Sequence, residues 1–471
     1  MYLEHYLKEL NYDNIPSFLI KYLDCPSLQR LKKIGYFCGM DYASKNIYNF
    51  SEYISRYDHS LTVALLVYKL TKNKTMTLAG LFHDIGTPCF SHVIDYMNND
   101  FEKQESTEAY TEEIIKNDTY LIDCLKQDNI DILDIINFKK YSIVDNDRPK
   151  LCADRLDGII LTGSIWTKSI SLEDITNIIN DITIFNNEIN EPEIGFKTKD
   201  IAKKVTSIND IINEYCHSKE DNYMMLLLAQ ITSTLINLNY ITYKDLYLLD
   251  EEELFSIIEE VDNPFIKELL YYFKNIKRED IVKNVIPNIK NRTINPLVNN
   301  ERLNGDIYTK GYKCFDKNLT NRYGMKFEIG KTYHTDGKIK FGNDGNGFHM
   351  CLRLEDTLRY FDAINNDVDI CQVVGFGKKD IGEDSYNDYY DMYAFENMYI
   401  AKLLTREEII NYAIKLYDYR IKRFISQFKL TEEEINIFKE KFKHNPSILE
   451  YIAYYQEDDK EAFQRRYQKR Y

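Results

Sequence analysis

The stretch HDIGTPCFSH, residues 83–92, stands directly after the apolar run LAGLF and decides how the first half of this chain is interpreted. An adjacent pair such as His83 and Asp84, followed by another histidine such as His92, can hold a metal ion and support the hydrolysis of phosphate esters. The same letters also occur in ordinary helices. The meaning of the stretch therefore depends on which other metal-binding side chains the sequence supplies.

Two further segments place such side chains at the edge of an apolar helical stretch. His59 lies in SRYDHSLTVALL, and Asp154 lies in KLCADRLDGII. Together with His83 and Asp84 they could project from helix ends into one cleft of a helical bundle. Two imidazoles and two carboxylates suit Fe, Mn, Zn or Mg better than a thiophilic ion. Such an ion binds phosphate oxygens and lowers the pKa of a bound water, which is the chemistry of phosphoester or phosphoanhydride hydrolysis.

Four segments, in this order, resemble the motifs of the HD superfamily of metal-dependent phosphohydrolases, and most closely its deoxynucleoside triphosphate triphosphohydrolase (dNTPase) branch. They are SLQRLKKIG (27–35), RYDHSL (56–61), HDIGTPCFSH (83–92) and ADRLD (153–157). The resemblance covers residues 20–170, and the helical periodicity that continues to residue 300 fits the fold that it implies.

The resemblance implies a divalent-metal site whose ligands are His59, His83, Asp84 and Asp154. It also implies that Arg56 faces a substrate phosphate, that His92 lies near the reacting phosphorus, and that Asp84 is catalytic as well as a ligand. In this branch the helix containing QRL carries residues near the base and sugar. Tyr36 and Phe37 follow that helix here, and they could stack on a nucleobase or belong to the core.

The sequence departs from the dNTPase pattern at two positions. Thr87 stands where that branch usually has a catalytic histidine, and Thr107-Glu108 stands where it commonly has His-Glu. The Thr87 hydroxyl can contact a substrate phosphate, but it cannot exchange a proton near neutral pH as histidine can. Loss of a positioned acid or base typically costs on the order of a hundred- to ten-thousand-fold in rate. His92 and Glu108 are therefore the candidates for proton transfer, and His92 is the stronger because imidazole titrates near neutral pH.

Three functions remain open at this point. The first is a metal-dependent hydrolase of nucleotides, including dNTPs, and the second is a phosphodiesterase or nuclease that uses the same site. The third is a catalytically altered HD scaffold that binds a nucleotide and acts as a sensor or regulator. The complete ligand set favours an enzyme, whereas Thr87 and Thr107 favour the scaffold.

The predicted fold class is multidomain: a mainly α-helical HD bundle, then a smaller α+β domain, then C-terminal helices. Apolar residues recur with helical spacing up to residue 300, and the turn-rich segment INPLVNNERLNGDIYTKG marks a domain boundary. Beyond it, Asp336-Gly337 between two alternating runs predicts a hairpin, and DICQVVGFG predicts another strand. The predicted domains are 1–304, 305–405 and 406–471.

The second predicted domain resembles a small domain of unknown function that recurs in phage and bacterial proteins. The segments that carry this resemblance are GYKCFDKNLT, FEIGKTYHTDGKIKF and GNGFHMCLRLEDTLRYF. Several potential zinc ligands occur there, namely Cys314, His334, His349, Cys351 and Cys371. Their spacing is not that of a paired-cysteine zinc knuckle, so buried thiols in a small sheet are the preferred interpretation.

Composition limits the expected partners and location. The net charge of −15 disfavours a general nucleic-acid-binding surface, and nine cysteines in no compact pattern indicate free thiols in a reducing compartment. The N-terminal residues contain no apolar signal-peptide core, and the most apolar run, residues 224–238, is too short to span a bilayer. We expect a cytoplasmic homo-oligomer, not bound to membranes, whose partner is a nucleotide or another phosphate ester.

Overall fold

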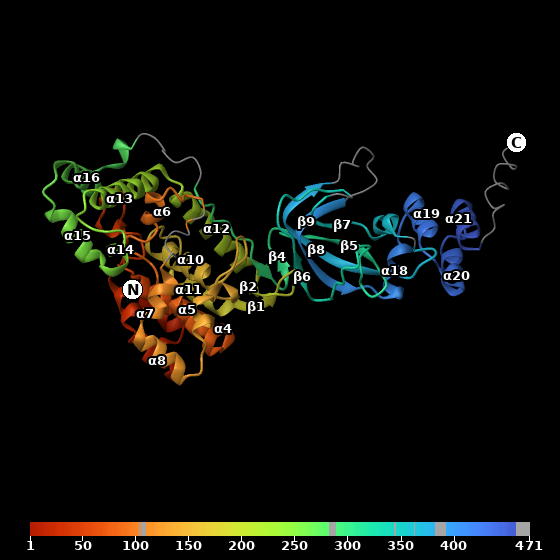
Figure 1. The fold of residues 1–471 in the computed structure, drawn as a ribbon, viewed down its shortest axis with the longest axis horizontal. Helices are drawn as coiled ribbons and strands as arrows, with labels where there is room; N and C mark the ends of the chain where they lie inside the picture. Colours follow the sequence, from red (N-terminus) through yellow and green to blue (C-terminus); the bar gives the residue numbers. More distant parts are fainter. Residues whose placement is uncertain are drawn as a thin grey trace. The chain divides into compact units, whose positions relative to one another are not determined.

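The structure is a computed structural model that describes residues 1–102, 104, 110–281, 289–342, 345–361, 363–381 and 392–457. It divides into two compact units. The first comprises Met1–Asn187 with Pro192–Gly305, and the second comprises Glu188–Glu191 with the chain from Asp306 onward. The first unit is mainly helical, whereas the second begins with strands and continues into helices (Figure 1). The predicted fold class is confirmed.

The first unit is built mainly from helices, some joined by short turns and others by long loops such as the one between residues 31 and 55. They are α1 Tyr2–Glu9, α2 Ser17–Leu23, α3 Pro26–Arg30, α4 Arg56–Thr71, α5 Lys74–Phe82, α6 Val93–Met97, α7 Thr111–Asn117, α8 Thr119–Gln127, α9 Ile132–Ile136, α10 Ala153–Ile165, α11 Leu172–Asp181, α12 Lys199–Cys216, α13 Lys219–Asn237, α14 Asp245–Leu248, α15 Glu251–Glu260 and α16 Pro264–Asn275. A small sheet in the order β1-β2-β3-β4 accompanies them. Its strands are β1 Ile182–Asn186, β2 Pro192–Phe196, β3 Leu297–Val298 and β4 Glu301–Arg302.

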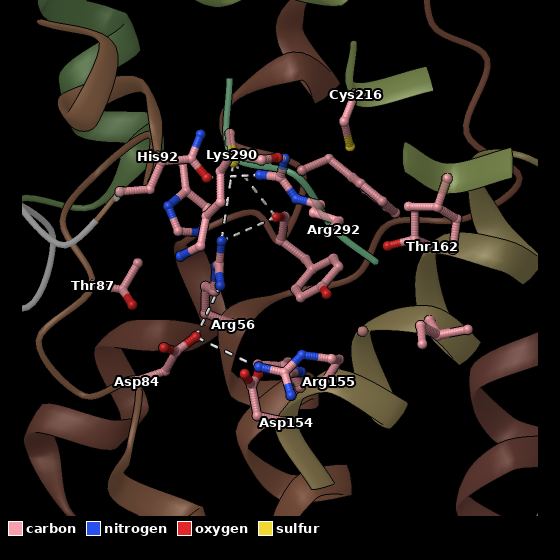
Figure 2. A pocket seen from close by; sticks show the side chains of 18 of the residues that line it. Arg56, Asp84, Thr87, His92, Asp154, Arg155, Thr162, Cys216, Lys290 and Arg292 are labelled. Carbon is pink, nitrogen blue, oxygen red and sulfur yellow. Dashed lines mark hydrogen bonds and ion pairs between the residues drawn. The ribbon is translucent and has the colours of Figure 1, made fainter. Parts of the chain in front are cut away.

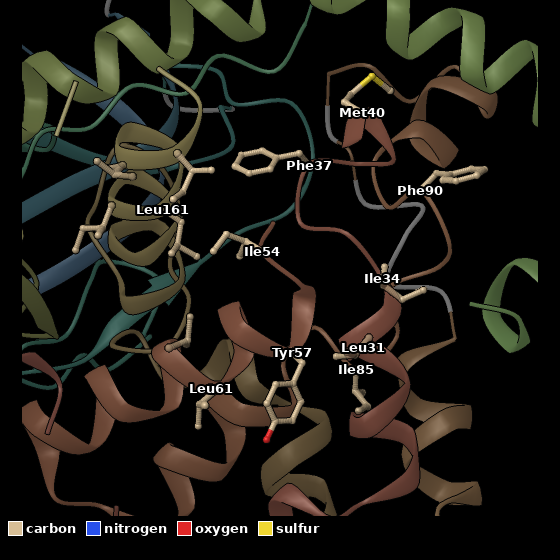
Figure 3. Close-up of a cluster of buried hydrophobic side chains, with 14 of the residues drawn as sticks. Leu31, Ile34, Phe37, Met40, Ile54, Tyr57, Leu61, Ile85, Phe90 and Leu161 are labelled. Atoms are coloured by element: carbon tan, nitrogen blue, oxygen red, sulfur yellow. The ribbon is translucent and has the colours of Figure 1, made fainter. Parts of the chain in front are cut away.

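Helix α4 is the central element of this unit. It begins with a capping box, in which the Ser55 side chain accepts a hydrogen bond from the Asp58 backbone N–H and the Asp58 carboxylate accepts one from Ser55 N–H. Its residues are buried on nearly every face, because α5 and α10 pack beside it. Figure 3 draws part of the surrounding hydrophobic cluster, with Leu61 from α4 and Leu161 from α10. The packing fixes the first turn of α4 relative to the first turn of α10.

The second unit contains a small antiparallel barrel followed by helices. The strands are β5 Thr309–Asp316, β6 Thr332–His334, β7 Phe348–Cys351, β8 Val368–Ile381 and β9 Met392–Leu403. Their order is β6-β9-β7-β5-β8, and β9 also pairs with β8, so four of the strands close into a ring. Closure of this kind removes exposed sheet edges. The helices are α17 Leu354–Thr357, α18 Arg406–Ala413, α19 Asp418–Gln427, α20 Glu432–Lys441 and α21 Pro446–Gln456.

Two local expectations for this unit have different outcomes. The strand predicted from DICQVVGFG is confirmed, since it lies within β8. The predicted hairpin around Asp336-Gly337 is wrong, because β6 pairs with β9. A turn does form, with Gly337 at φ 96°, but Lys340 N–H then donates to the Asn346 carbonyl within the following loop. The backbone groups of Lys340 and Asn346 therefore bond to each other within this loop, and they do not form a second strand beside β6.

The cysteines of the second unit carry buried thiols. All nine cysteines are free, and Cys314, Cys351 and Cys371 are buried. Across the described ranges, the groups of side chains that could hold a metal ion lie in the first unit. None of the helices described is both long enough and apolar enough to cross a membrane.

A buried ion pair ties β4 to β2 near the end of the first unit. The Arg302 guanidinium binds both carboxylate oxygens of Glu193, at 2.5 and 2.8 Å, and the two side chains are 1% and 0% exposed. The same Glu193 carboxylate accepts a hydrogen bond from Leu151 N–H at 3.2 Å. Leu151 leads directly into helix α10, so this pair helps to fix where α10 begins.

We predict that Arg302→Ala lowers the free energy of unfolding of the first unit by about 3–5 kcal/mol, because it leaves Glu193 buried without its countercharge. Urea unfolding followed by the fluorescence of Trp166, which is the single tryptophan and lies in this unit, measures the change. Lys267→Ala is the control, since the Lys267–Asp262 pair is exposed and such surface pairs contribute little to stability. Equal effects of the two substitutions would contradict the prediction.

Candidate metal centre and cavity

Three helix ends bring the four predicted metal ligands together. His59 lies in the first turn of α4, His83 and Asp84 directly follow α5, and Asp154 lies in the first turn of α10. His59 Nε2 and His83 Nε2 lie 3.1 and 3.6 Å from the same oxygen, Asp154 Oδ1. The two oxygens of Asp84 lie 3.8 Å from His59 Nε2 and 3.7 Å from His83 Nε2. The donor atoms therefore surround one small volume.

The donor set fits a divalent cation. One ligand atom each from His59, His83 and Asp154 lies within 4.8 Å of the others. His83 Nδ1 bonds to the Gly80 carbonyl at 2.7 Å, which places the proton on Nδ1 and leaves Nε2 as a lone-pair donor. That Nε2 atom is buried and has no hydrogen-bond partner in the part of the chain that the structure describes. A buried nitrogen aimed at two carboxylates is what a coordinated cation requires.

The charges around this volume also favour a cation at its centre. Burial lowers the pKa of His59, but Asp154, Asp157 and Asp84 outweigh it and raise the pKa to about 10. For Asp84, burial opposes ionisation, yet His83, Arg56 and His59 hold its pKa at about 2. The carboxylates are therefore ionised and draw positive charge toward the imidazoles.

Asp157 orients the candidate ligand His59 and has no assigned role in the sequence-based prediction. Its carboxylate is fully buried, and Oδ2 lies 2.7 Å from His59 Nδ1. Its other oxygen accepts a hydrogen bond from the Tyr6 hydroxyl at 2.7 Å. A carboxylate behind a ligand histidine fixes the ring and raises its basicity. The available signal was spacing, because Asp157 follows Asp154 by three residues and so shares its helix face.

Arg56 and Tyr36 both line the site, and Figure 2 shows Arg56 beside Asp84. The Arg56 guanidinium donates to Asp84 Oδ2 at 2.8 Å and to Ser91 Oγ at 3.2 Å. It also lies over the Tyr36 ring, 4.9 Å from the ring centre, and that ring packs against His59 at 5.1 Å. Phe37 is buried and stacks on Phe50 at 4.2 Å, and both rings also line the cavity of this site.

The four candidate metal ligands open into a cavity of about 640 Å³ within the first unit. Its wall contains several basic side chains that the sequence analysis did not single out, namely Lys139, Arg148, Arg155, Lys290 and Arg292. Figure 2 shows Arg155, Lys290 and Arg292 around this space. Burial lowers the pKa of Arg148 to about 10, and the nearby charges of Arg155 and Arg292 add to the effect. Crowded cations of this kind favour an anionic ligand.

Thr87 and His92 lie on the side of the cavity that holds Asp84 and Arg56 (Figure 2). Thr87 is 5% exposed, and its carbonyl accepts a hydrogen bond from Arg30. His92 is partly exposed, and its Nδ1 lies 2.8 Å from Oδ2 of the buried Asp95. Its Nε2 is therefore the nitrogen left for a ligand. The other predicted positions, Thr107 and Glu108, lie outside the described residues.

The turn before His92 has an unusual backbone. Phe90 and Ser91 have φ values of 61° and 45°, in the left-handed region that non-glycine residues seldom adopt. Cys89 N–H donates to the Leu246 carbonyl at 2.7 Å, and Phe90 N–H donates to Glu251 Oε1 at 3.0 Å. Strain of this kind persists only where the surroundings hold it. The α14–α15 region thus positions His92.

Two family models match parts of this chain. Residues 56–160 match the family model described as HD domain. The first unit carries an HD domain. Residues 309–411 match a second model, described as Domain of unknown function (DUF7666). The HD match covers the segment that contributes all four predicted ligands.

Three relatives are similar to parts of this chain. "Uncharacterized protein YdhJ" of Bacillus subtilis is 30% identical over 31% of this chain and 42% of its own length. "Uncharacterized protein MG461" of Mycoplasma genitalium is 24% identical over 73% of this chain and 86% of its own length. "Metal-dependent phosphohydrolase cns2" of Cordyceps militaris is 24% identical over 36% of this chain and 46% of its own length. The chain thus spans less than half the length of the first and third.

We predict that Asp157→Asn weakens binding of Mn²⁺ roughly 10- to 100-fold, because the neutral amide no longer supports the basicity of His59. Calorimetric titration of Mn²⁺ into the metal-free protein measures the affinity, and circular dichroism checks that the variant is folded. Asp123→Asn serves as the control, since Asp123 is 71% exposed on α8. Unchanged Mn²⁺ affinity in a folded Asp157→Asn protein would show that Asp157 does not support the ligand.

A second prediction concerns the pH dependence of stability. Burial raises the pKa of Glu251 to about 8, although the N–H groups of Gly35 and Phe90 oppose the shift; Asp41 adds to it. In the unfolded chain Glu251 ionises near about 4.3. Its contribution to stability is therefore complete at low pH and is lost as the pH rises toward 8.

Glu251→Gln removes this titration and keeps an oxygen that can accept from Phe90. We expect its melting temperature to fall less than that of the unmodified protein between about pH 5 and pH 8. Glu252→Gln is the control, because Glu252 is 73% exposed. If Glu251→Gln and Glu252→Gln show the same pH dependence, the assignment of the titration to Glu251 is wrong.

Proposed function

We propose that this protein is a metal-dependent phosphohydrolase that acts on nucleotides. The observation that carries the proposal is His83 Nε2, which has no hydrogen-bond partner among the described residues. It lies among His59, Asp84 and Asp154 in a cavity whose wall also carries several basic side chains. The HD match over residues 56–160 supports it, as does the similarity to the Cordyceps militaris protein that is named a metal-dependent phosphohydrolase.

His59, His83, Asp84 and Asp154 would hold the divalent ion, which is Fe, Mn, Mg or Zn by the chemistry of its donors. When bound, such an ion supplies Lewis acidity toward a phosphoryl oxygen and lowers the pKa of a coordinated water. Asp157 keeps His59 oriented for this role. Arg56, bound to Asp84, keeps that carboxylate ionised and in place.

The basic side chains of the cavity would bind the rest of the phosphate chain. Arg155 and Arg292 present planar guanidinium groups, which suit bidentate contacts to phosphate oxygens. Lys290 adds a point charge on the same wall. A volume of about 640 Å³ lies within the range of about 300–1,000 Å³ found for small-molecule sites. These features support a nucleotide substrate, and the resemblance to the dNTPase branch favours a dNTP in particular.

His92 is the proposed proton-transfer residue. Asp95 holds its Nδ1 at 2.8 Å, so the ring is oriented and Nε2 is free to give a proton to a leaving oxygen or take one. Thr87, which replaces the usual histidine, contributes a hydroxyl that can bind a phosphate oxygen. Glu108 remains a predicted second acid–base group.

The alternative function is a nucleotide-binding scaffold without turnover. The observation in its favour is Thr87, a buried residue beside Asp84 that cannot transfer protons near neutral pH. Cyclic dinucleotide or oligonucleotide cleavage would instead indicate the phosphodiesterase or nuclease alternative.

The test is a screen of the purified protein against dNTPs, NTPs, cyclic dinucleotides and short oligonucleotides with Mn²⁺, Fe²⁺ or Mg²⁺. We predict hydrolysis of mononucleotides that stops with EDTA and returns when metal is restored. His92→Ala should keep its metal and lose about a hundred- to ten-thousand-fold in kcat, whereas Thr87→Ala should lose much less.

His334→Ala is a control outside this cavity, since His334 is 53% exposed in the second unit. Full activity of His92→Ala would disprove the proton-transfer role. Failure of the metal-loaded protein to turn over any substrate in the screen would favour the scaffold.

A further inference from the structure

A second cavity, of about 470 Å³, lies entirely within the second unit. Strands β5 and β7 line it, together with the loop that follows β5 and the turn Leu358–Tyr360 after α17. Its size falls within the range of about 300–1,000 Å³ found for small-molecule sites. The domain that contains it matches a family of unknown function, so no ligand is assigned to this space.

The charged side chains of this cavity are all basic. Lys313, Arg322 and Arg359 line it together with His349, and the described lining residues include no aspartate or glutamate. This is unusual for a chain with a net charge of −15. Lys313 Nζ donates to the His349 carbonyl at 2.5 Å, and within the described ranges neither Lys313 nor Arg322 forms an ion pair.

The basic side chains of this cavity lower the pKa values of their neighbours. Burial lowers the pKa of Lys313 to about 8, and Arg322 contributes in the same direction. Burial also lowers the pKa of His349 to about 4, with Lys313 and Arg322 adding to the shift. Lys313 and Arg322 thus repel each other, and an anion bound between them would stabilise both charges.

Aromatic side chains make up much of the remaining wall. Phe327 and Phe348 belong to or pack against the barrel core, but Tyr323 is 74% exposed and Tyr360 is 40% exposed. Phe341 also lines the cavity and packs edge-on against His349, with ring centres 4.8 Å apart. Exposed aromatic rings beside a pocket provide surfaces on which a planar group can stack.

We propose that this cavity binds a phosphate ester of mononucleotide size that carries an aromatic ring. Lys313 and Arg322 would contact the phosphate, and Tyr323 and Phe341 would pack against the ring. Lysine and arginine give charge-assisted hydrogen bonds to phosphate oxygens, and base-to-aromatic stacking tolerates different bases. The proposal does not depend on the hydrolase function, because every residue that carries it lies in the second unit.

The test is methyl NMR of the full-length protein labelled on its methionine methyl groups, in EDTA, with adenosine 5′-monophosphate (AMP) as the probe. Met350 and Met392 line the second cavity, whereas Met40 and Met225 line the first, so the two sites report separately. Met→Leu variants assign the signals. We expect saturable shifts of the Met350 and Met392 signals, and at least tenfold weaker binding of adenosine or inorganic phosphate alone.

Lys313→Gln and Arg322→Gln should each weaken AMP binding at this cavity at least tenfold, with the barrel signals otherwise retained. Lys310→Gln is the matched control, since Lys310 lies on the same strand, is 58% exposed and pairs with Asp306. Unmoved Met350 and Met392 signals, or equal affinity in Lys313→Gln, would overturn the proposal. If inorganic phosphate binds as tightly as AMP, the proposed packing of Tyr323 and Phe341 against an aromatic ring is wrong. Shifts confined to Met40 and Met225 would show that AMP binds only in the first cavity, which would also overturn the proposal.

Discussion

The hydrogen-bonded chain Tyr6–Asp157–His59 is the constraint on which the first site depends. It joins α1, α10 and α4 through two contacts of 2.7 Å to one fully buried carboxylate. A buried charge without such partners would cost several kcal/mol, so the three helices must meet in this arrangement. Once they meet, the first turns of α4 and α10 face each other, and His59 and Asp154 can share one cation.

The sequence allowed the four candidate ligands and the helical character of the first unit to be predicted, because both are local properties. His59, His83-Asp84 and Asp154 sit at the ends of apolar runs whose spacing shows where helices begin and end. Asp157 was within reach of the same reasoning, since three residues separate it from Asp154. The short strands β1 to β4 were missed because two- to five-residue strands carry too little alternation to recognise.

The basic cavity wall could not be predicted, because its members come from separate parts of the chain. Arg148 and Arg155 flank the start of α10, whereas Lys290 and Arg292 follow α16 by more than a dozen residues. Nothing in either segment indicates that they face one cavity. The same holds for Glu251, which reaches Phe90 across 161 positions. In the second unit, the buried pair of Arg420 with Glu355, at 2.6 Å, likewise joins distant segments.

The two cavities differ in the charged groups that line them, and this difference suits one to hydrolysis and the other to binding. The first combines cations with carboxylates, and its carboxylates converge on imidazoles where a divalent ion fits. The described lining of the second contains cations and aromatic rings but no carboxylate, so it lacks the charged oxygen ligands that usually hold a hard divalent ion. An aromatic phosphate in the second cavity would therefore be held by direct contacts with Lys313 and Arg322. The groups present there suit recognition of an anion, whereas the groups that suit metal-assisted hydrolysis lie in the first.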